Sequence, residues 1–118
     1  MIKTHVIVDF YGADAETFEK TDLLKVAINR ALSSLGLSHI QDSYIQFEPI
    51  GVTATVVAEN FHFSIHTWPE NNACAIDLYS SQDQVFTRNI AEALKNEFRA
   101  SEYDIKFLNR KKKILGLT

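Results

Sequence analysis

The chain has 118 residues, of which 46% are hydrophobic and 23% charged, and its formal net charge is −3. This length predicts one domain, 1–118, and is too short for two ordinary ones. No apolar run reaches the ~18 residues of a membrane span and no signal-peptide pattern is present, so we expect a cytoplasmic protein with no membrane partner. The acidic balance gives no reason to expect nucleic acid. The single cysteine, Cys74, excludes an intrachain disulfide and a multi-cysteine zinc site.

The first predicted elements are a strand and a helix. A β-branched run predicts a strand over Thr4–Phe10. Apolar residues then recur at helical spacing, which predicts a helix over Asp22–Leu35. Thr21 is a candidate N-cap for this helix, and Gly36 marks its end.

Short apolar runs separated by turn residues follow. They predict four strands: Tyr44–Phe47, Val52–Val57, Phe61–His66 and Ala73–Tyr79. Their short connections are typical of antiparallel neighbours. Apolar side chains at four-residue steps predict a second helix over Gln82–Arg99, and Asp104–Leu108 is a last strand before a basic tail at 110–113. This order predicts an α+β fold in which two helices cover one face of a mostly antiparallel sheet.

The segment Phe61–Glu70 concentrates side chains that can carry chemistry. Alternation along a strand places its polar side chains on one face and its phenylalanines on the other. The polar ones are His62, Ser64 and His66. Two histidines four residues apart on a strand are separated by ~13 Å, too far for one metal ion, so no metal site is predicted.

Trp68 and Glu70 are expected just beyond this strand. An aromatic face beside a carboxylate suits a flat heterocycle attached to a sugar or a cation. The alternative is that Trp68 fills the core and that Glu70 is a solvated turn residue.

The chain resembles the bacterial and archaeal S-adenosylmethionine decarboxylases, pyruvoyl enzymes that supply aminopropyl groups for spermidine synthesis. Four stretches carry the resemblance: Asp9–Asp14, Phe47–Thr53, Ser64–Glu70 and Ala75–Tyr79. It implies a two-layer sandwich fold and an adenosyl ligand such as S-adenosylmethionine. It also implies that Phe47 and Trp68 are the aromatic pair around the adenine and that Glu70 accepts the ribose hydroxyls.

The same resemblance places a different residue where the cofactor forms. Family members cut their own backbone before the serine of a Glu-Ser-His pattern, and that serine becomes the pyruvoyl group. Here the corresponding residues are Asn60, Phe61 and His62. A phenyl ring offers no nucleophile for an N→O acyl shift, so no pyruvoyl cofactor is expected. The alternative of an unrecognised processing site rests on Ser64, the nearest hydroxyl, which would need a different base and a different backbone strain.

Three further positions matter for catalysis in the family. Thr53 stands where a serine assists processing, and His66 matches the processing histidine. Ser81 replaces a cysteine that acts as a proton donor, and its hydroxyl is a far weaker acid than a thiol. Ser81 also fits a capping box, S-x-x-Q, at the start of the second helix.

The leading hypothesis is therefore a decarboxylase homologue that binds S-adenosylmethionine or a related adenosyl compound without self-processing, or that acts as the inactive partner of an active paralogue. An alternative is a cofactor-free lyase or hydrolase acting on the sulfonium, with His62, Ser64 and His66 as its polar groups. A decarboxylase of ornithine or arginine would also need the missing pyruvoyl group. The remaining alternative is a structural protein whose Phe47 and Trp68 fill the core.

Assembly is the last expectation. Helices on one face of a sheet leave the other face open, and apolar strand residues on an open face need a partner. Val6, Val8, Phe61 and Phe63 are the residues expected there. We therefore expect a homodimer, and the resemblance implies paired chains with the ligand site near their interface.

Overall fold

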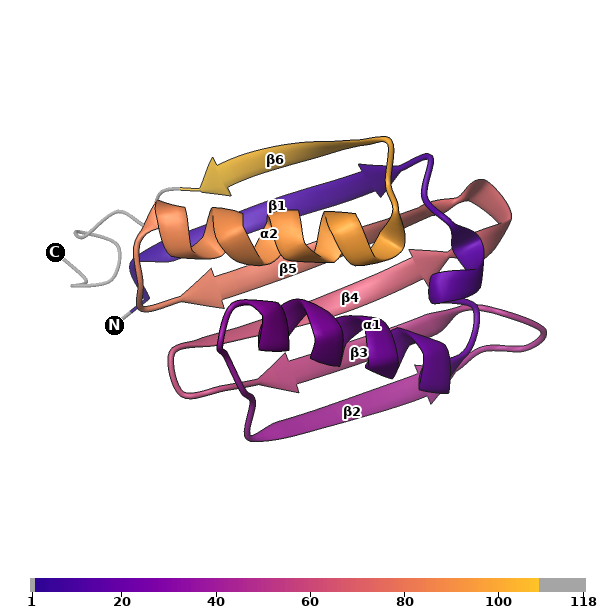
Figure 1. Cartoon of the computed structure of the whole chain (residues 1–118), viewed down its shortest axis with the longest axis horizontal. Helices are drawn as coiled ribbons and strands as arrows, with labels where there is room; N and C mark the ends of the chain where they lie inside the picture. Colours follow the sequence, from indigo (N-terminus) through magenta and orange to yellow (C-terminus); the bar gives the residue numbers. More distant parts are fainter. Residues whose placement is uncertain (1, 109–118) are drawn as a thin grey trace, which may run out of the picture.

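A computed structural model describes residues 2–108 (Figure 1), and the basic tail at 110–113 lies outside these described residues. The elements in chain order are β1 (Thr4–Tyr11), the short 3-10 helix η1 (Ala15–Thr17), α1 (Thr21–Ser34), β2 (Gln41–Gln46), β3 (Val52–Val57), β4 (Phe61–Trp68), the 3-10 helix η2 (Pro69–Asn71), β5 (Ala73–Ser80), α2 (Gln84–Phe98) and β6 (Glu102–Leu108). The predicted order of strands and helices is confirmed. Within residues 2–108, neither helix is long and apolar enough to cross a membrane.

The strands form one sheet in the order β2-β3-β4-β5-β1-β6, and every neighbouring pair is antiparallel. Both helices lie on the same face, with α2 over β1 and β5 and α1 over β3 and β4 (Figure 1). The predicted two-layer α+β sandwich is therefore confirmed. Among the described residues, no helix lies on the other face of the sheet.

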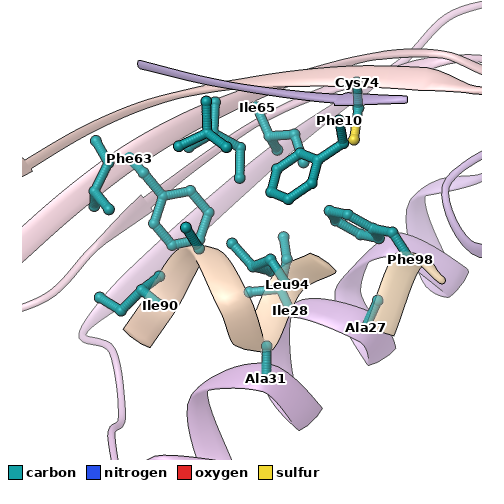
Figure 2. Packing of buried hydrophobic residues seen from close by; sticks show 14 of the residues in the cluster. Phe10, Ala27, Ile28, Ala31, Phe63, Ile65, Cys74, Ile90, Leu94 and Phe98 are labelled. Atoms are coloured by element: carbon teal, nitrogen blue, oxygen red, sulfur yellow. The ribbon is translucent and has the colours of Figure 1, made fainter. Parts of the chain in front are cut away.

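The core lies between the sheet and the two helices. Side chains alternate along β1 and β4 between buried and more exposed, as a half-covered sheet requires. Figure 2 shows Phe10, Phe63 and Ile65 of the sheet facing Leu94 and Phe98 of α2. The rings of Phe10 and Phe98 meet edge to face with centroids 5.6 Å apart. Every second residue of a strand therefore faces the helices, and the residues between them lie on the other side of the sheet, which we call the open face.

The expected content of the open face is wrong. Val6, Val8, Phe61 and Phe63 are buried under the helices, because their positions in the alternation point toward α1 and α2. The open face carries polar and small side chains with scattered apolar ones, such as Ile7 of β1. The apolar argument for a homodimer therefore does not apply to those four residues.

The predicted N-caps of both helices are wrong, whereas Gly36 does follow the end of α1, with φ of +69°. α1 begins at Thr21 itself, and its N-cap is Lys20, whose side chain makes no capping bond. α2 is capped by Asp83, whose carboxylate accepts the Phe86 N–H at 3.0 Å. Ser81 lies too far upstream to reach that first turn.

Candidate functional site

A groove of about 350 Å³ opens at one end of the sheet, where β2, β3 and β4 meet η2. It is lined by Phe47, Ile50, Gly51, Thr53, His66, Thr67, Trp68 and Glu70. The structure therefore brings together five of the predicted site residues, which are Phe47, Thr53, His66, Trp68 and Glu70.

Trp68 belongs to β4, contrary to the expectation that it lies beyond the strand. It pairs with Ala73 of β5 and is the last residue of β4. The strand stops there because the next residue, Pro69, has no N–H to continue the ladder. Pro69 starts η2, which carries Glu70 to the exposed rim of the groove. Asn72 then adopts a left-handed conformation with φ of 52°, and its N–H donates to the Pro69 carbonyl at 3.1 Å.

The opposite wall is the connection from Phe47 to Gly51 between β2 and β3. It closes through a hydrogen bond from the Phe47 N–H to the Gly51 carbonyl at 2.8 Å. Gly51 has φ of +115°, a conformation that side chains rarely adopt. The floor is fixed by the buried Thr67 hydroxyl, which accepts the Val52 N–H at 2.8 Å and donates to the Phe18 carbonyl at 3.1 Å.

The two aromatic side chains of the groove stand out of the core. Phe47 is 51% exposed and Trp68 is 45% exposed. The alternative reading, in which both fill the core, is therefore wrong. The His66 ring lies beside Trp68 with centroids 6.2 Å apart, and its Nδ1 is 3.0 Å from the Thr53 hydroxyl.

The other predicted catalytic positions lie at the opposite end of β4. Phe61 is only 5% exposed, and its ring packs against those of Phe63 and Phe86. The carbonyl of Asn60, just before it, accepts the Ser81 N–H at 3.0 Å. The Ser81 hydroxyl is 3.4 Å from the same oxygen, so this side chain faces the β3–β4 turn.

The two groups of residues are far apart within one chain. Phe61 and His66 are five residues apart on one strand, which corresponds to roughly 17 Å. Phe61 also points to the helices, whereas His66 lies on the open face. One chain therefore does not assemble all the predicted catalytic positions into a single site.

The three polar side chains of β4 do share the open face, as predicted, but they do not converge. His62 stacks on Tyr79 with centroids 4.7 Å apart, and His66 contacts Thr53 in the groove. Ser64 lies between them, half-buried, opposite Thr55.

Sequence reasoning missed a second polar contact on this face. The His5 Nε2 is 2.6 Å from an Asp77 carboxylate oxygen, and the His5 ring stacks on Tyr79 with centroids 4.1 Å apart. His5, Tyr79 and His62 are direct register partners across β1, β5 and β4. The alternation of polar and apolar residues along each strand can be seen in the sequence, but the pairing of β1 with β5 cannot. In the part of the chain described, no group of three or more His, Cys, Asp or Glu side chains could hold a metal ion.

Comparison with known proteins identifies the family to which this groove and fold belong. The sequence matches the S-adenosylmethionine decarboxylase family profile over residues 4–111. The chain belongs to the S-adenosylmethionine decarboxylase family. It is therefore homologous to enzymes of polyamine biosynthesis.

Individual relatives support this family assignment. The chain is 34% identical over 108 residues to an S-adenosylmethionine decarboxylase proenzyme of Sulfurihydrogenibium sp., covering 92% of this chain and 74% of that protein. It is 31% identical to the proenzyme of Prochlorococcus marinus, covering 93% of this chain and 88% of that protein.

Solved structures agree on the fold. The crystal structure of the Aquifex aeolicus adenosylmethionine decarboxylase superposes with a TM-score of 0.81 at 27% identity, covering 92% of this chain and 90% of that one. The crystal structure of the Trypanosoma brucei AdoMetDC-delta26 monomer is 14% identical, with a TM-score of 0.64 over 89% of this chain and 45% of that one, and it has the same fold.

Proposed function

We propose that this family member binds S-adenosylmethionine or a related adenosyl compound in the groove and forms no pyruvoyl group. The observation that carries the proposal is the contrast between the two ends of β4. At one end two exposed aromatic rings and a carboxylate line an open groove. At the other end a buried phenyl ring stands where the resemblance implies a pyruvoyl-forming serine.

The groove has the chemistry that an adenosyl ligand needs. Phe47 and Trp68 offer aromatic faces to a purine, and such stacking contributes roughly 1–3 kcal/mol per base at other nucleobase sites. The carboxylate of Glu70 can accept hydrogen bonds from two neighbouring ribose hydroxyls. The aromatic faces also attract the positive charge of a sulfonium.

The residues around position 61 do not fit a pyruvoyl group. Its formation needs a hydroxyl at this position to attack the preceding carbonyl, and Phe61 has none. The ring is held in the core by Phe63 and Phe86, with centroid distances of 6.3 and 5.9 Å. The Ser64 hydroxyl is three residues away on the opposite face of the strand, so it does not replace the missing group.

Titration calorimetry with S-adenosylmethionine tests the binding. Trp68→Ala and Glu70→Gln should each weaken affinity by about tenfold or more, which corresponds to ~1.4 kcal/mol. Ile40→Ala is the matched control, because Ile40 is exposed and does not line the groove. If Trp68→Ala bound S-adenosylmethionine as tightly as the wild type, the groove would not be the binding site.

An intact mass spectrum tests the missing cofactor. We expect one uncleaved species near 13.4 kDa, unchanged by a reductant that attacks carbonyls. Two fragments with a break between Asn60 and Ser64 would restore a pyruvoyl decarboxylase and overturn this part of the proposal.

A second candidate function is a role as partner of an active decarboxylase, and the separation of the two groups of residues favours it. We infer that two chains pair through the open face about a two-fold axis that lies between the sheets and across the strands. The Phe61 end of one chain would then lie against the groove of the other. A partner chain that carries serine at position 61 and is cut there would bring that cut end of its β4 beside the groove of this chain.

Two measurements test this candidate. Sedimentation of the chain alone should show a homodimer, and a dilution-stable monomer would contradict the pairing. An active relative whose own groove tryptophan is replaced by alanine should regain decarboxylation when co-expressed with this chain. Rescue should fail when this chain carries Trp68→Ala.

A further inference from the structure

Gln46 joins the groove to the first helix. It is the last residue of β2, and its side chain lies half-buried on the helix-covered side of the sheet. The connection 47–51 follows it directly, and Figure 1 shows this connection and the start of α1 at the same end of the molecule.

The amide oxygen of Gln46 serves the helix. It accepts the Thr21 N–H at 2.8 Å and the Thr21 hydroxyl at 3.1 Å. The first N–H groups of a helix have no partner within it, and the N-cap, Lys20, supplies none from its side chain. Gln46 therefore satisfies a helix terminus from a distant strand.

The amide nitrogen of Gln46 serves the groove wall. It donates to the carbonyls of Phe47 at 3.1 Å and Gly51 at 3.0 Å, which are the two ends of the connection. It also donates to the Glu19 carbonyl at 3.0 Å, just before α1. A primary amide has two N–H groups and two lone pairs, so one N–H is shared between two of the three carbonyls and every polar group of this side chain is engaged.

Two more bonds tie the same segments together. The Gly51 N–H donates to the Glu19 carbonyl at 3.0 Å, and the Lys20 ammonium donates to the Pro49 carbonyl at 2.7 Å. Phe47 is half exposed, so packing around its ring does not fix its position. The backbone of Phe47 is held by its bonds to Gly51 and to the Gln46 side chain, and these two residues in turn contact residues 19–21.

We propose that Gln46 is a positioning residue for the ligand groove: it holds the connection 47–51 against the start of α1 and so keeps the Phe47 ring opposite Trp68. This inference rests on the proposed adenosyl binding for its functional consequence. Its structural part, the tethering of the connection, stands on the hydrogen bonds alone.

Two substitutions separate the two ends of the amide. Gln46→Glu keeps an oxygen acceptor for Thr21 near the positive end of the helix dipole, but it loses both donors and sets a negative charge beside three carbonyls. Gln46→Met has a similar length and loses both functions. Gln41→Met is the matched control, because Gln41 is an exposed residue of the same strand.

The first readout needs no ligand. Amide hydrogen exchange at Phe47 and Gly51 should accelerate at least about tenfold in Gln46→Glu, while the Thr21 amide keeps its protection. In Gln46→Met all three amides should exchange faster. Unchanged exchange at Phe47 and Gly51 in both variants would overturn the tethering, and so would a rise shared equally by every amide of the sheet.

The second readout is affinity for S-adenosylmethionine at a temperature where each variant is fully folded. Gln46→Glu should weaken binding about five- to tenfold, and Gln41→Met should not change it. Loosened exchange with unchanged affinity would overturn the positioning role. If the wild type itself does not bind, the proposed function fails, and the exchange data still decide whether Gln46 tethers the groove wall.

Discussion

Replacing Phe61 by serine tests how position 61 is used in this fold. The ring is 5% exposed and contacts Phe63 and Phe86, so its removal deletes buried apolar contacts. Truncation of a buried phenylalanine costs about 3–5 kcal/mol, and the position lies at the margin of the core, which favours the lower value. A loss of about 3 kcal/mol should lower the Tm by about 12 °C for a chain of this length.

Urea unfolding followed by circular dichroism measures this loss. The midpoint should fall without a change in the slope, because the native fold is retained. Phe61→Leu is the control, since it keeps most of the volume and should lose about 1 kcal/mol. A loss below about 1 kcal/mol in Phe61→Ser would refute the reasoning, because position 61 would then not be part of the core.

Three other groups give predictions of their own. Burial raises the pKa of the Asp42 carboxyl, but the hydrogen bond from Tyr44 and nearby cations outweigh it and hold the pKa below its usual 3.8. The free energy of unfolding should therefore fall as the pH drops below about 4, and fall less in Asp42→Asn; parallel pH profiles would contradict this. Burial also raises the pKa of the Cys74 thiol, so iodoacetamide at pH 8 should label the native chain slowly and the urea-unfolded chain fast, as mass spectrometry would show. Gly51→Ala forces a side chain into φ of +115°, so it should cost about 1–3 kcal/mol in urea unfolding and weaken ligand binding, and a neutral result would mean that the connection relaxes freely.

The fold was largely predictable because its elements have clear periodicities. Alternating apolar residues marked β3 and β4, and a four-residue repeat marked α2, whose boundaries differ by only one or two residues from those expected. Caps were less predictable, since several polar residues near a helix start compete for the same N–H groups. At α1 the partner is Gln46, twenty-five residues from Thr21, and no local pattern contains such a contact.

The groove was predicted as a set of residue types, but its division from position 61 was not. Family resemblance assigned both groups to one function, whereas the distance between them follows from the rise per residue of the one strand that carries both. Once β4 extends from Phe61 to Trp68, the two groups stand at opposite strand ends. The error about the open face has another cause: the alternation of β4 was predicted correctly, but alternation alone does not say which of the two faces the helices cover.

The environment of Phe61 also bears on the proposed loss of processing in a chain that keeps its groove. The Ser81 N–H donates to the Asn60 carbonyl at 3.0 Å, next to the Phe61–Ser80 pair where β4 and β5 begin to pair, so it holds the uncut backbone just before position 61. A serine at position 61 would place a hydroxyl beside the core, whereas a phenyl ring adds buried apolar area there. We therefore expect phenylalanine at position 61 to stabilise the uncut fold more than serine would. It leaves unaltered the distant contacts of Gln46 and Thr67 that shape the groove. Binding and processing can thus diverge in this fold, because the packing that supports each lies in a different part of the sheet.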